Sequence, residues 1–180
     1  MKLNKYSHLF LWLFFSGLLL AAIVGATLLG YWQKIPELDR TYISFGIILV
    51  FIIGWIFSLI DIIWITKFVS NSKSQRPADF ETMIAKKEER SGFFSRLLVS
   101  LGFAGTLVGL LFVTISLGSL ISAEQEIESI RTNVQGALGG MSAAFLTTII
   151  GLGGSIFIEL FHLIFKNIYF NLLSRWEKQK

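Results

Sequence analysis

Two threonines lie among apolar residues, each near the middle of a long uncharged stretch. Thr106 follows Arg96 by ten residues, and Thr148 follows Gly136 by 12. In helices that cross a bilayer, each hydroxyl would lie about 15–18 Å from its entry face, near the midplane of a ~30 Å hydrocarbon core. Two hydroxyls at one depth can pass a proton or ion along, or hold a water. They can equally bond back to the carbonyl four residues earlier, and the spacing leaves both interpretations open.

Ionisable residues continue the face of the helix that carries Thr148. Steps of three and four residues lead from Thr148 through Gly151 and Ser155 to Glu159, His162 and Lys166. Ionisable groups inside a membrane face protein or water rather than lipid, which makes Glu159 a functional candidate. It could instead form an ion pair with His162 or Lys166. His162 could relay protons near neutral pH, or simply lie half-exposed at the interface.

Asp61 presents a similar case on an earlier apolar stretch. It precedes Lys67 by six residues, about 9 Å along a helix. We expect an ion pair with Lys67 or with a basic group on the last helix.

The elements that must position these residues are four uncharged stretches. Residues 6–33, 41–60, 97–123 and 132–158 contain no Asp, Glu, Lys or Arg. About 20 mostly apolar residues suffice to cross a bilayer. Charged residues form 16% of the chain and apolar residues 53%, which excludes a soluble globule and a disordered chain. The sequence therefore predicts an all-α membrane protein with four transmembrane helices.

The basic residues predict the orientation. Of the 16 Lys and Arg, 13 fall before the first helix, in 67–96 or from Lys166 to the C-terminus. The positive-inside rule places these segments, and both termini, in the cytoplasm. The net charge of +4 is thus an orientation signal rather than a nucleic-acid site. Lys86 and Lys87 beside Glu88 and Glu89 suggest a solvated, mixed-charge helix. The first apolar run is too long for a typical cleaved signal core, so we expect it to remain as a helix.

The four predicted helices divide into two kinds. The first two are rich in Leu, Ile, Phe and Trp and suit contact with lipid. The last two carry glycines and hydroxyls, and small residues allow close helix packing in lipid. We therefore expect them to form an inner pair. The glycines predicted to pack there are Gly102, Gly105, Gly109, Gly140 and Gly151.

Other chemistry is not indicated. The chain has no cysteine and two histidines, which excludes disulfides, thiolate metal sites and a His-cluster metal site. No Ser–His–Asp spacing or phosphate-binding loop is visible, so we expect neither an enzyme nor a bound cofactor.

Two segments of the inner pair resemble the MotA/TolQ/ExbB proton-channel family. Residues 101–110, LGFAGTLVGL, are similar to its LGLLGTVxGL segment, and residues 140–152, GMSAAFLTTIIGL, to its GIxxALxTTxxGL segment. The two occur in order on antiparallel helices with a short outer loop between them. This resemblance covers about residues 97–165, a little over a third of the chain.

The resemblance implies the pore-forming subunit of an ion-driven motor in the bacterial inner membrane. Five subunits would surround a dimer of a single-span MotB/TolR/ExbD-like partner, whose transmembrane Asp carries the proton (or Na⁺). The last two predicted helices, over residues 97–166, would line the central pore. Ion flow would drive rotation between ring and partner. The implied ion-pathway residues are Thr106 and Thr148, with Thr147, Ser142 and Ser155 as helpers; Glu159, His162 and Asp61 would tune the cytoplasmic exit.

The chain departs from the family pattern at one pore residue and in the small size of its cytoplasmic part. Ala143 stands where TolQ- and ExbB-like members often carry a pore Glu. We expect outer-layer transmembrane helices over 1–66 and pore-lining helices over 97–166. Between them, 67–96 would be a cytoplasmic loop that contains a short helix near 77–90. Residues 167–180 would form a cytoplasmic tail. So small a cytoplasmic part favours coupling to an envelope process over a flagellar rotor. The alternatives are a structural four-span scaffold without ion conduction and a holin-like pore.

Overall fold

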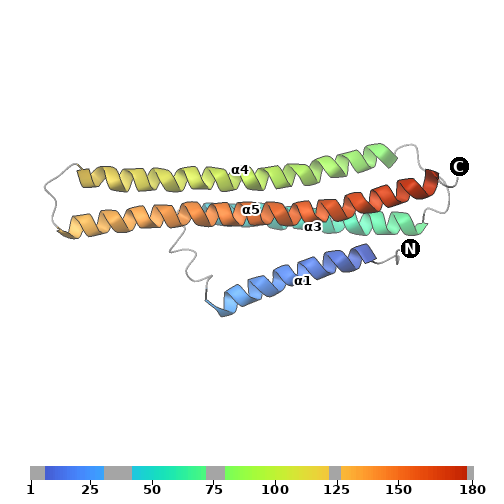
Figure 1. Ribbon diagram of the computed structural model, residues 1–180, viewed down its shortest axis with the longest axis horizontal. Helices are drawn as coiled ribbons and strands as arrows, with labels where there is room; N and C mark the ends of the chain where they lie inside the picture. The colour runs from blue at the N-terminus through green and yellow to red at the C-terminus, as the bar shows by residue number, and fades with distance from the viewer. Residues whose placement is uncertain (1–6, 31–41, 72–79, 122–126, 178–180) are drawn as a thin grey trace.

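The computed structural model is an all-helical arrangement. It describes residues 7–30, 42–71, 80–121 and 127–177, and every described residue except Leu29, Gly30 and Tyr42 is helical. The helices are α1 (Ser7–Leu28), α3 (Ile43–Asn71), α4 (Phe80–Ile121) and α5 (Ile127–Glu177) (Figure 1). Gly30, with φ +71°, ends α1, where its N–H donates to Thr27 O at 3.0 Å. Glycine adopts this left-handed conformation without strain.

Three helices are long and apolar enough to cross a membrane. The candidate spans are Ile43–Phe68 in α3, Phe80–Ser119 in α4 and Ile127–Asn171 in α5. α1 has 22 residues but a shorter apolar part, Phe10–Gly25. Apolar helices of this length identify a membrane-embedded protein. The fourth span predicted from the sequence stays a prediction.

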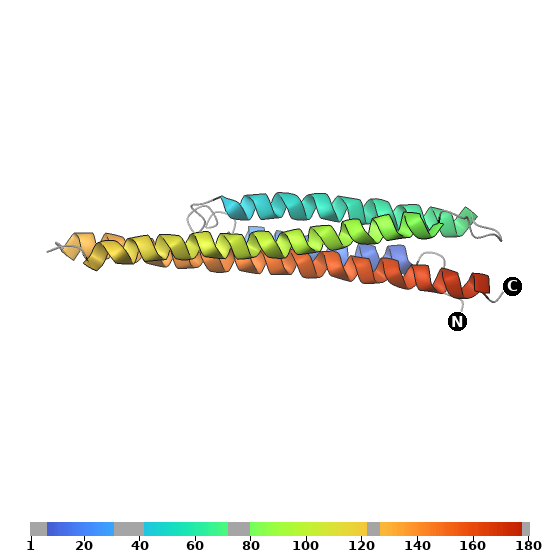
Figure 2. The same cartoon turned by 90° about the horizontal axis from the view of Figure 1, so that it is seen from above.

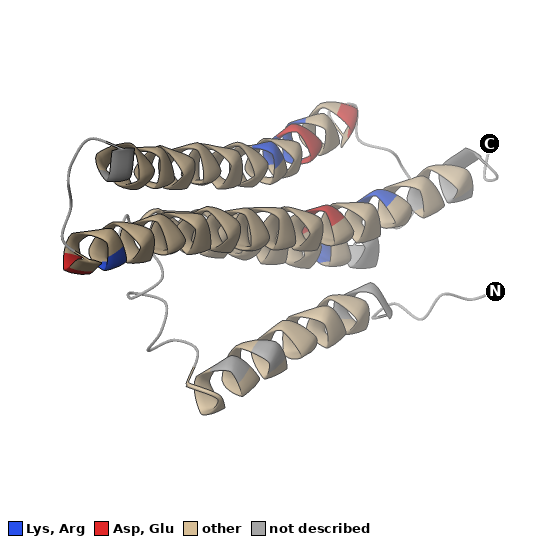
Figure 3. Ribbon diagram, turned by 60° about the vertical axis from the view of Figure 1, so that its left-hand side comes forward, with Lys and Arg blue, Asp and Glu red and all other residues tan. Residues whose placement is uncertain are grey.

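α4 and α5 form a long antiparallel hairpin (Figures 1 and 2). α4 has 42 residues, about 63 Å, and α5 has 51, about 77 Å. Both exceed a ~30 Å bilayer core, so each extends beyond it. Charged residues lie towards the hairpin's ends and leave a long uncharged middle (Figure 3).

The start of α4 differs from the cytoplasmic loop that we expect over 67–96. Instead of a separate short helix near 77–90, α4 begins at Phe80 and continues unbroken into the apolar segment. The physical reason is burial: Phe80 and Ile84 pack with Ile65 of α3 and with Phe165 and Ile168 of α5. The same cluster extends α5 through most of the expected tail, to Glu177.

Glycines bring α4 and α5 into backbone contact. A Cβ on Gly102 would lie 3.2 Å from Gly151 Cα, and one on Gly109 would lie 2.6 Å from Gly140 O. A Cβ on Gly105 would lie 2.6 Å from the side chain of Thr147. Larger residues would force the helices apart, so these glycines set their spacing.

α1 and α3 form an outer layer on one side of the hairpin. Ile47 of α3 packs with Leu98 and Ile158, and Trp12 of α1 packs with Ile62 and Phe161. This layer lies beside the part of the hairpin nearer the chain termini and leaves the opposite part uncovered (Figures 1 and 2). The outer layer is therefore offset from the hairpin along its long axis.

Two adjacent glycines test the packing. In Gly140→Ala the new methyl group would meet Gly109 O at 2.8 Å and Val113 N at 3.0 Å, whereas at Gly139 nothing lies within 4 Å. We expect Gly140→Ala to destabilise the fold by about 1–3 kcal/mol through overpacking. Thermal unfolding in detergent, followed by circular dichroism, measures it. Gly139→Ala is the matched control, and equal melting temperatures for the two variants would refute the assigned contact.

Candidate functional site

The two threonines singled out from the sequence meet between α4 and α5. The hydroxyls of Thr106 and Thr148 are hydrogen-bonded, and both side chains are half-buried. Thr106 Oγ1 also lies 3.0 Å from Gly102 O, and Thr148 Oγ1 lies 3.0 Å from Ala144 O. Thr106 Oγ1 is also 3.4 Å from Ala144 O, so two hydroxyl protons serve four contacts. One threonine can donate to the other while the second donates to a carbonyl, so the direction of the shared bond can reverse.

The threonine pair lies halfway along the apolar part of the hairpin. At one end, the hydroxyls of Ser95 and Ser155 are 2.8 Å apart; at the other, a Cβ on Gly136 would lie 2.9 Å from Ser116 Oγ. Thr106 is 11 residues from Ser95 and ten from Ser116. These separations correspond to about 16 Å and 15 Å, so the pair is at the centre of a segment as long as a bilayer core is thick.

Polar contacts continue from the threonine pair along the α4–α5 seam. The Ser95–Ser155 bond is buried. Further towards the termini, Glu88 Oε1 lies 3.6 Å from His162 Nε2 and 3.6 Å from Lys166 Nζ. We call this series of contacts the polar track; its members are Thr106, Thr148, Ser95, Ser155, Glu88, His162 and Lys166. From Thr148 to Lys166 it extends 18 residues, about 27 Å.

Glu88, and not Glu159, is the acidic residue that lies beside His162 and Lys166. The sequence predicts that Glu159 could pair with His162 or Lys166, but both of these side chains lie beside Glu88 instead. Glu159 is exposed and has no hydrogen-bond or ion-pair partner among the residues that the structure describes. Sequence reasoning missed Glu88 because it was placed in a solvated loop helix. Its spacing from Ser95, seven residues or two helical turns, was the available signal.

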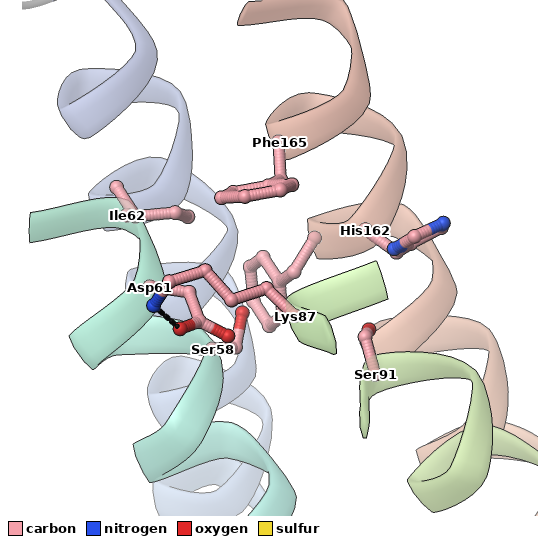
Figure 4. Close-up of a pocket in the computed structure, with 8 residues that line it drawn as sticks. Ser58, Asp61, Ile62, Lys87, Ser91, His162 and Phe165 are labelled. Carbon is pink, nitrogen blue, oxygen red and sulfur yellow. Dashed lines mark hydrogen bonds and ion pairs between the residues drawn. The ribbon is translucent and has the colours of Figure 1, made fainter. Parts of the chain in front are cut away.

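Asp61 joins α3 to α4 rather than to its expected partners. Its Oδ1 lies 2.5 Å from Lys87 Nζ (Figure 4). The same oxygen lies 2.5 Å from Arg90 Nη2. The side chains are 10% exposed for Asp61, 16% for Lys87 and 34% for Arg90, so this ion cluster is largely withdrawn from solvent. Among the side chains that the structure describes, neither Lys67 nor a basic group of α5 contacts Asp61. The mixed-charge helix at 86–89 is thus only partly solvated, because Lys87 lies under α3.

Aromatic rings complete the ion cluster. Lys87 Nζ lies 4.5 Å from the centre of the Trp64 ring, and Arg90 Cζ lies 4.6 Å from that of Phe57. Each distance is within the range of a cation–π contact. A small pocket lies between Asp61 and His162 and is lined also by Ser58 and Ser91 (Figure 4).

The remaining predicted hydroxyls lie outside the threonine contact. Thr147 is fully buried against Gly105, and its hydroxyl lies 3.1 Å from Ala143 O and 3.0 Å from Ala144 O. Ser142 Oγ donates to Leu138 O at 2.9 Å. Neither hydroxyl bonds to Thr106 or Thr148. Within the described ranges, no group of three or more His, Asp or Glu could hold a metal ion.

The ion cluster makes a stability prediction. Asp61→Asn leaves Lys87 and Arg90 withdrawn from solvent with no neutralising charge, so we expect up to about 3 kcal/mol of destabilisation. Unfolding in detergent by heat or denaturant measures it. Glu89→Gln removes an exposed carboxylate from the same helix segment and is the control. If the two variants unfold alike, the cluster does not hold α3 against α4.

In comparisons with known proteins, no family model, curated protein or solved structure matches the chain.

Proposed function

We propose that the protein is the pore-forming subunit of an ion-driven motor in a bacterial inner membrane, of the MotA/TolQ/ExbB kind. The transported ion is a proton or, alternatively, Na⁺. The observation that carries the proposal is the contact between Thr106 and Thr148 at the centre of the hairpin, continued by the polar track. The two sequence segments that resemble this family contain these same threonines.

The charges on the hairpin support a ring of subunits. Glu159 and Arg96 are exposed on helices whose apolar segments lie in the membrane. Lipid does not accommodate such groups, so protein or water must cover that side of α4 and α5. α1 and α3 cover the other side. A pentamer with α4 and α5 around a central pore, and α1 and α3 outside, meets both requirements.

The need for a second protein follows from the chemistry of the threonine pair. Hydroxyls can transmit a proton but do not hold one as an ionised carrier at neutral pH. The nearest acidic residue along α5 is Glu159, 11 residues or about 16 Å from Thr148. A carboxylate must therefore come from another chain. A dimer of a single-span protein with a transmembrane Asp, inside the ring, would supply it.

The mechanism then has three parts within this chain. When the partner's Asp releases its proton beside Thr148, the shared Thr106–Thr148 bond reverses and a hydroxyl passes a proton on. Bridging water would carry the proton over the seven residues, about 10 Å, from Thr148 to Ser155 and Ser95, and His162 and Glu88 would form the cytoplasmic end of the path. Asp61 is left out of the path because its carboxylate is held by Lys87 and Arg90. Successive neutralisation of Asp at five subunits would rotate ring and partner relative to each other.

The proposed topology has four spans, with α1 as the fourth and both termini in the cytoplasm. The basic residues before α1, between α3 and α4 and after α5 support this orientation. The small cytoplasmic surface supports work on an envelope process.

A structural scaffold is the second candidate, and one observation favours it. Both threonine hydroxyls have carbonyl partners within their own helices, so they are satisfied without any transported ion. A scaffold would need only the glycine packing and the ion cluster.

Removing one hydroxyl separates the two candidates. Thr148→Val keeps the shape of the side chain, so we expect intact assembly and at least a tenfold loss of partner-dependent proton flux; Thr148→Ser should restore most of it. The assay uses vesicles that hold the protein with its co-purified single-span partner and an internal pH-sensitive dye. Thr132→Val is the control, because Thr132 makes the same kind of bond, to Glu128 O, at the start of α5.

Subunit counting tests the assembly independently. Native mass spectrometry of the co-expressed complex should give five copies of this chain to two of the partner. A monomer or a symmetric dimer, or a complex that conducts no ions, would reject the motor in favour of the scaffold. Unchanged flux in Thr148→Val would remove Thr148 from the ion path.

A further inference from the structure

We propose that Arg96 of one copy forms an ion pair with Glu159 of the next copy, and that this pair closes each junction of the ring. The inference rests on the proposed ring of identical subunits and adds the contact that joins them. It also assigns Glu159 to assembly rather than to the cytoplasmic exit.

Glu159 is a carboxylate at the depth of the membrane span of α3. Its neighbour Ile158 packs on Gly54: a Cβ at Gly54 would lie 2.6 Å from Ile158 Cδ1. Gly54 is near the middle of the candidate span Ile43–Phe68. Ile158 and Phe161 are buried under the outer layer, whereas Glu159 is exposed on a side of α5 that no described helix covers. Measured from the threonine pair, Glu159 is 11 residues or about 16 Å away, at the edge of the bilayer core. An ionised group there, beside exposed apolar side chains, is stabilised by an opposite charge.

Arg96 carries the opposite charge at the same level of α4. The Cβ contact at Gly54 also includes Phe94, at 3.2 Å, which aligns this part of α4 with Ile158. The guanidinium of Arg96 lies over Gly92, where a Cβ would be 3.8 Å from Nη1. It therefore points back towards the level of Glu159. Arg96 is exposed, and like Glu159 it lacks an ion-pair or hydrogen-bond partner among the described residues.

Charge complementarity favours a second copy of this chain as the partner of Arg96 and Glu159. Each chain offers one unpaired cation on α4 and one unpaired anion on α5 at one level. A ring in which α4 of each copy faces α5 of the next neutralises every one of these charges, whatever the number of subunits. The same contact would cover exposed apolar side chains beside the pair: Phe103 (63% exposed), Ile156 (58%) and Leu163 (58%). A single-span partner bearing one Asp could neutralise at most some of the arginines and none of the glutamates.

Disulfide crosslinking tests the contact in the full-length protein. The chain contains no cysteine, so any disulfide between copies must join the introduced thiols. Arg96→Cys combined with Glu159→Cys, oxidised in native membranes, should give a ladder of covalent oligomers that ends at the closed ring. Each single variant should give none. Ser95→Cys with Ser155→Cys is the positive control, because these hydroxyls are 2.8 Å apart within one chain and should crosslink inside a monomer.

Charge reversal tests whether the pair contributes to assembly. Arg96→Glu and Glu159→Arg should each reduce the oligomer fraction at least tenfold, and the double reversal should restore it. Arg131→Glu, on an exposed arginine at the start of α5, is the control and should leave the oligomer intact. A double reversal no better than either single variant, or a crosslink confined to monomers, overturns the pairing.

The two proposals fail in different ways. A five-to-two complex with normal flux but no ladder overturns the Arg96–Glu159 pair and leaves the motor standing. A ladder in a protein that conducts no ions with any partner supports the pair and rejects the motor.

Discussion

The close approach of α4 and α5 is the constraint on which the rest of the structure depends. Glycine against glycine, at Gly102 with Gly151 and at Gly109 with Gly140, leaves no room for a side chain between the backbones. At that distance the hydroxyls of Thr106 and Thr148 reach each other, as do those of Ser95 and Ser155. A wider separation would leave each hydroxyl with only its own helix. The glycines thus bring hydroxyls of the two helices into contact in facing pairs.

The second fixed point is the ion cluster of Asp61 with Lys87 and Arg90. It binds the outer layer to the hairpin where apolar packing alone would allow the helices to slide, because one apolar surface in lipid resembles another. A directional contact at a defined residue removes that freedom. The inner pair can then present its polar track on one side while the outer helices remain registered on the other.

Local features of the sequence predict much of the fold. The uncharged stretches identify the apolar segments of α3, α4 and α5, and the glycine spacing singles out the pair that packs most closely. The depth of the two threonines followed from the rise of a helix. What could not be predicted depends on distant partners: Asp61 meets Lys87, 26 residues away, and Glu88 meets His162, 74 residues away. Nothing local in the sequence specifies how far α3 is shifted along the hairpin. The sequence alone therefore predicts a solvated loop helix for Lys87 and Glu88, and not contacts with α3 and α5.

The offset between the outer layer and the hairpin has a consequence for the bilayer itself. A flat membrane centred on α3 would leave exposed apolar side chains of α4, such as Leu110 and Ile115, beyond its surface; one centred on the threonine pair would leave the first turns of α1 in water. The thickness mismatch costs free energy with each ångström, and lipid adapts by thinning or tilting around the protein. An assembly of such subunits would carry a collar of deformed lipid, deeper on the side of the outer helices. Its position in the cell would then depend on local membrane thickness.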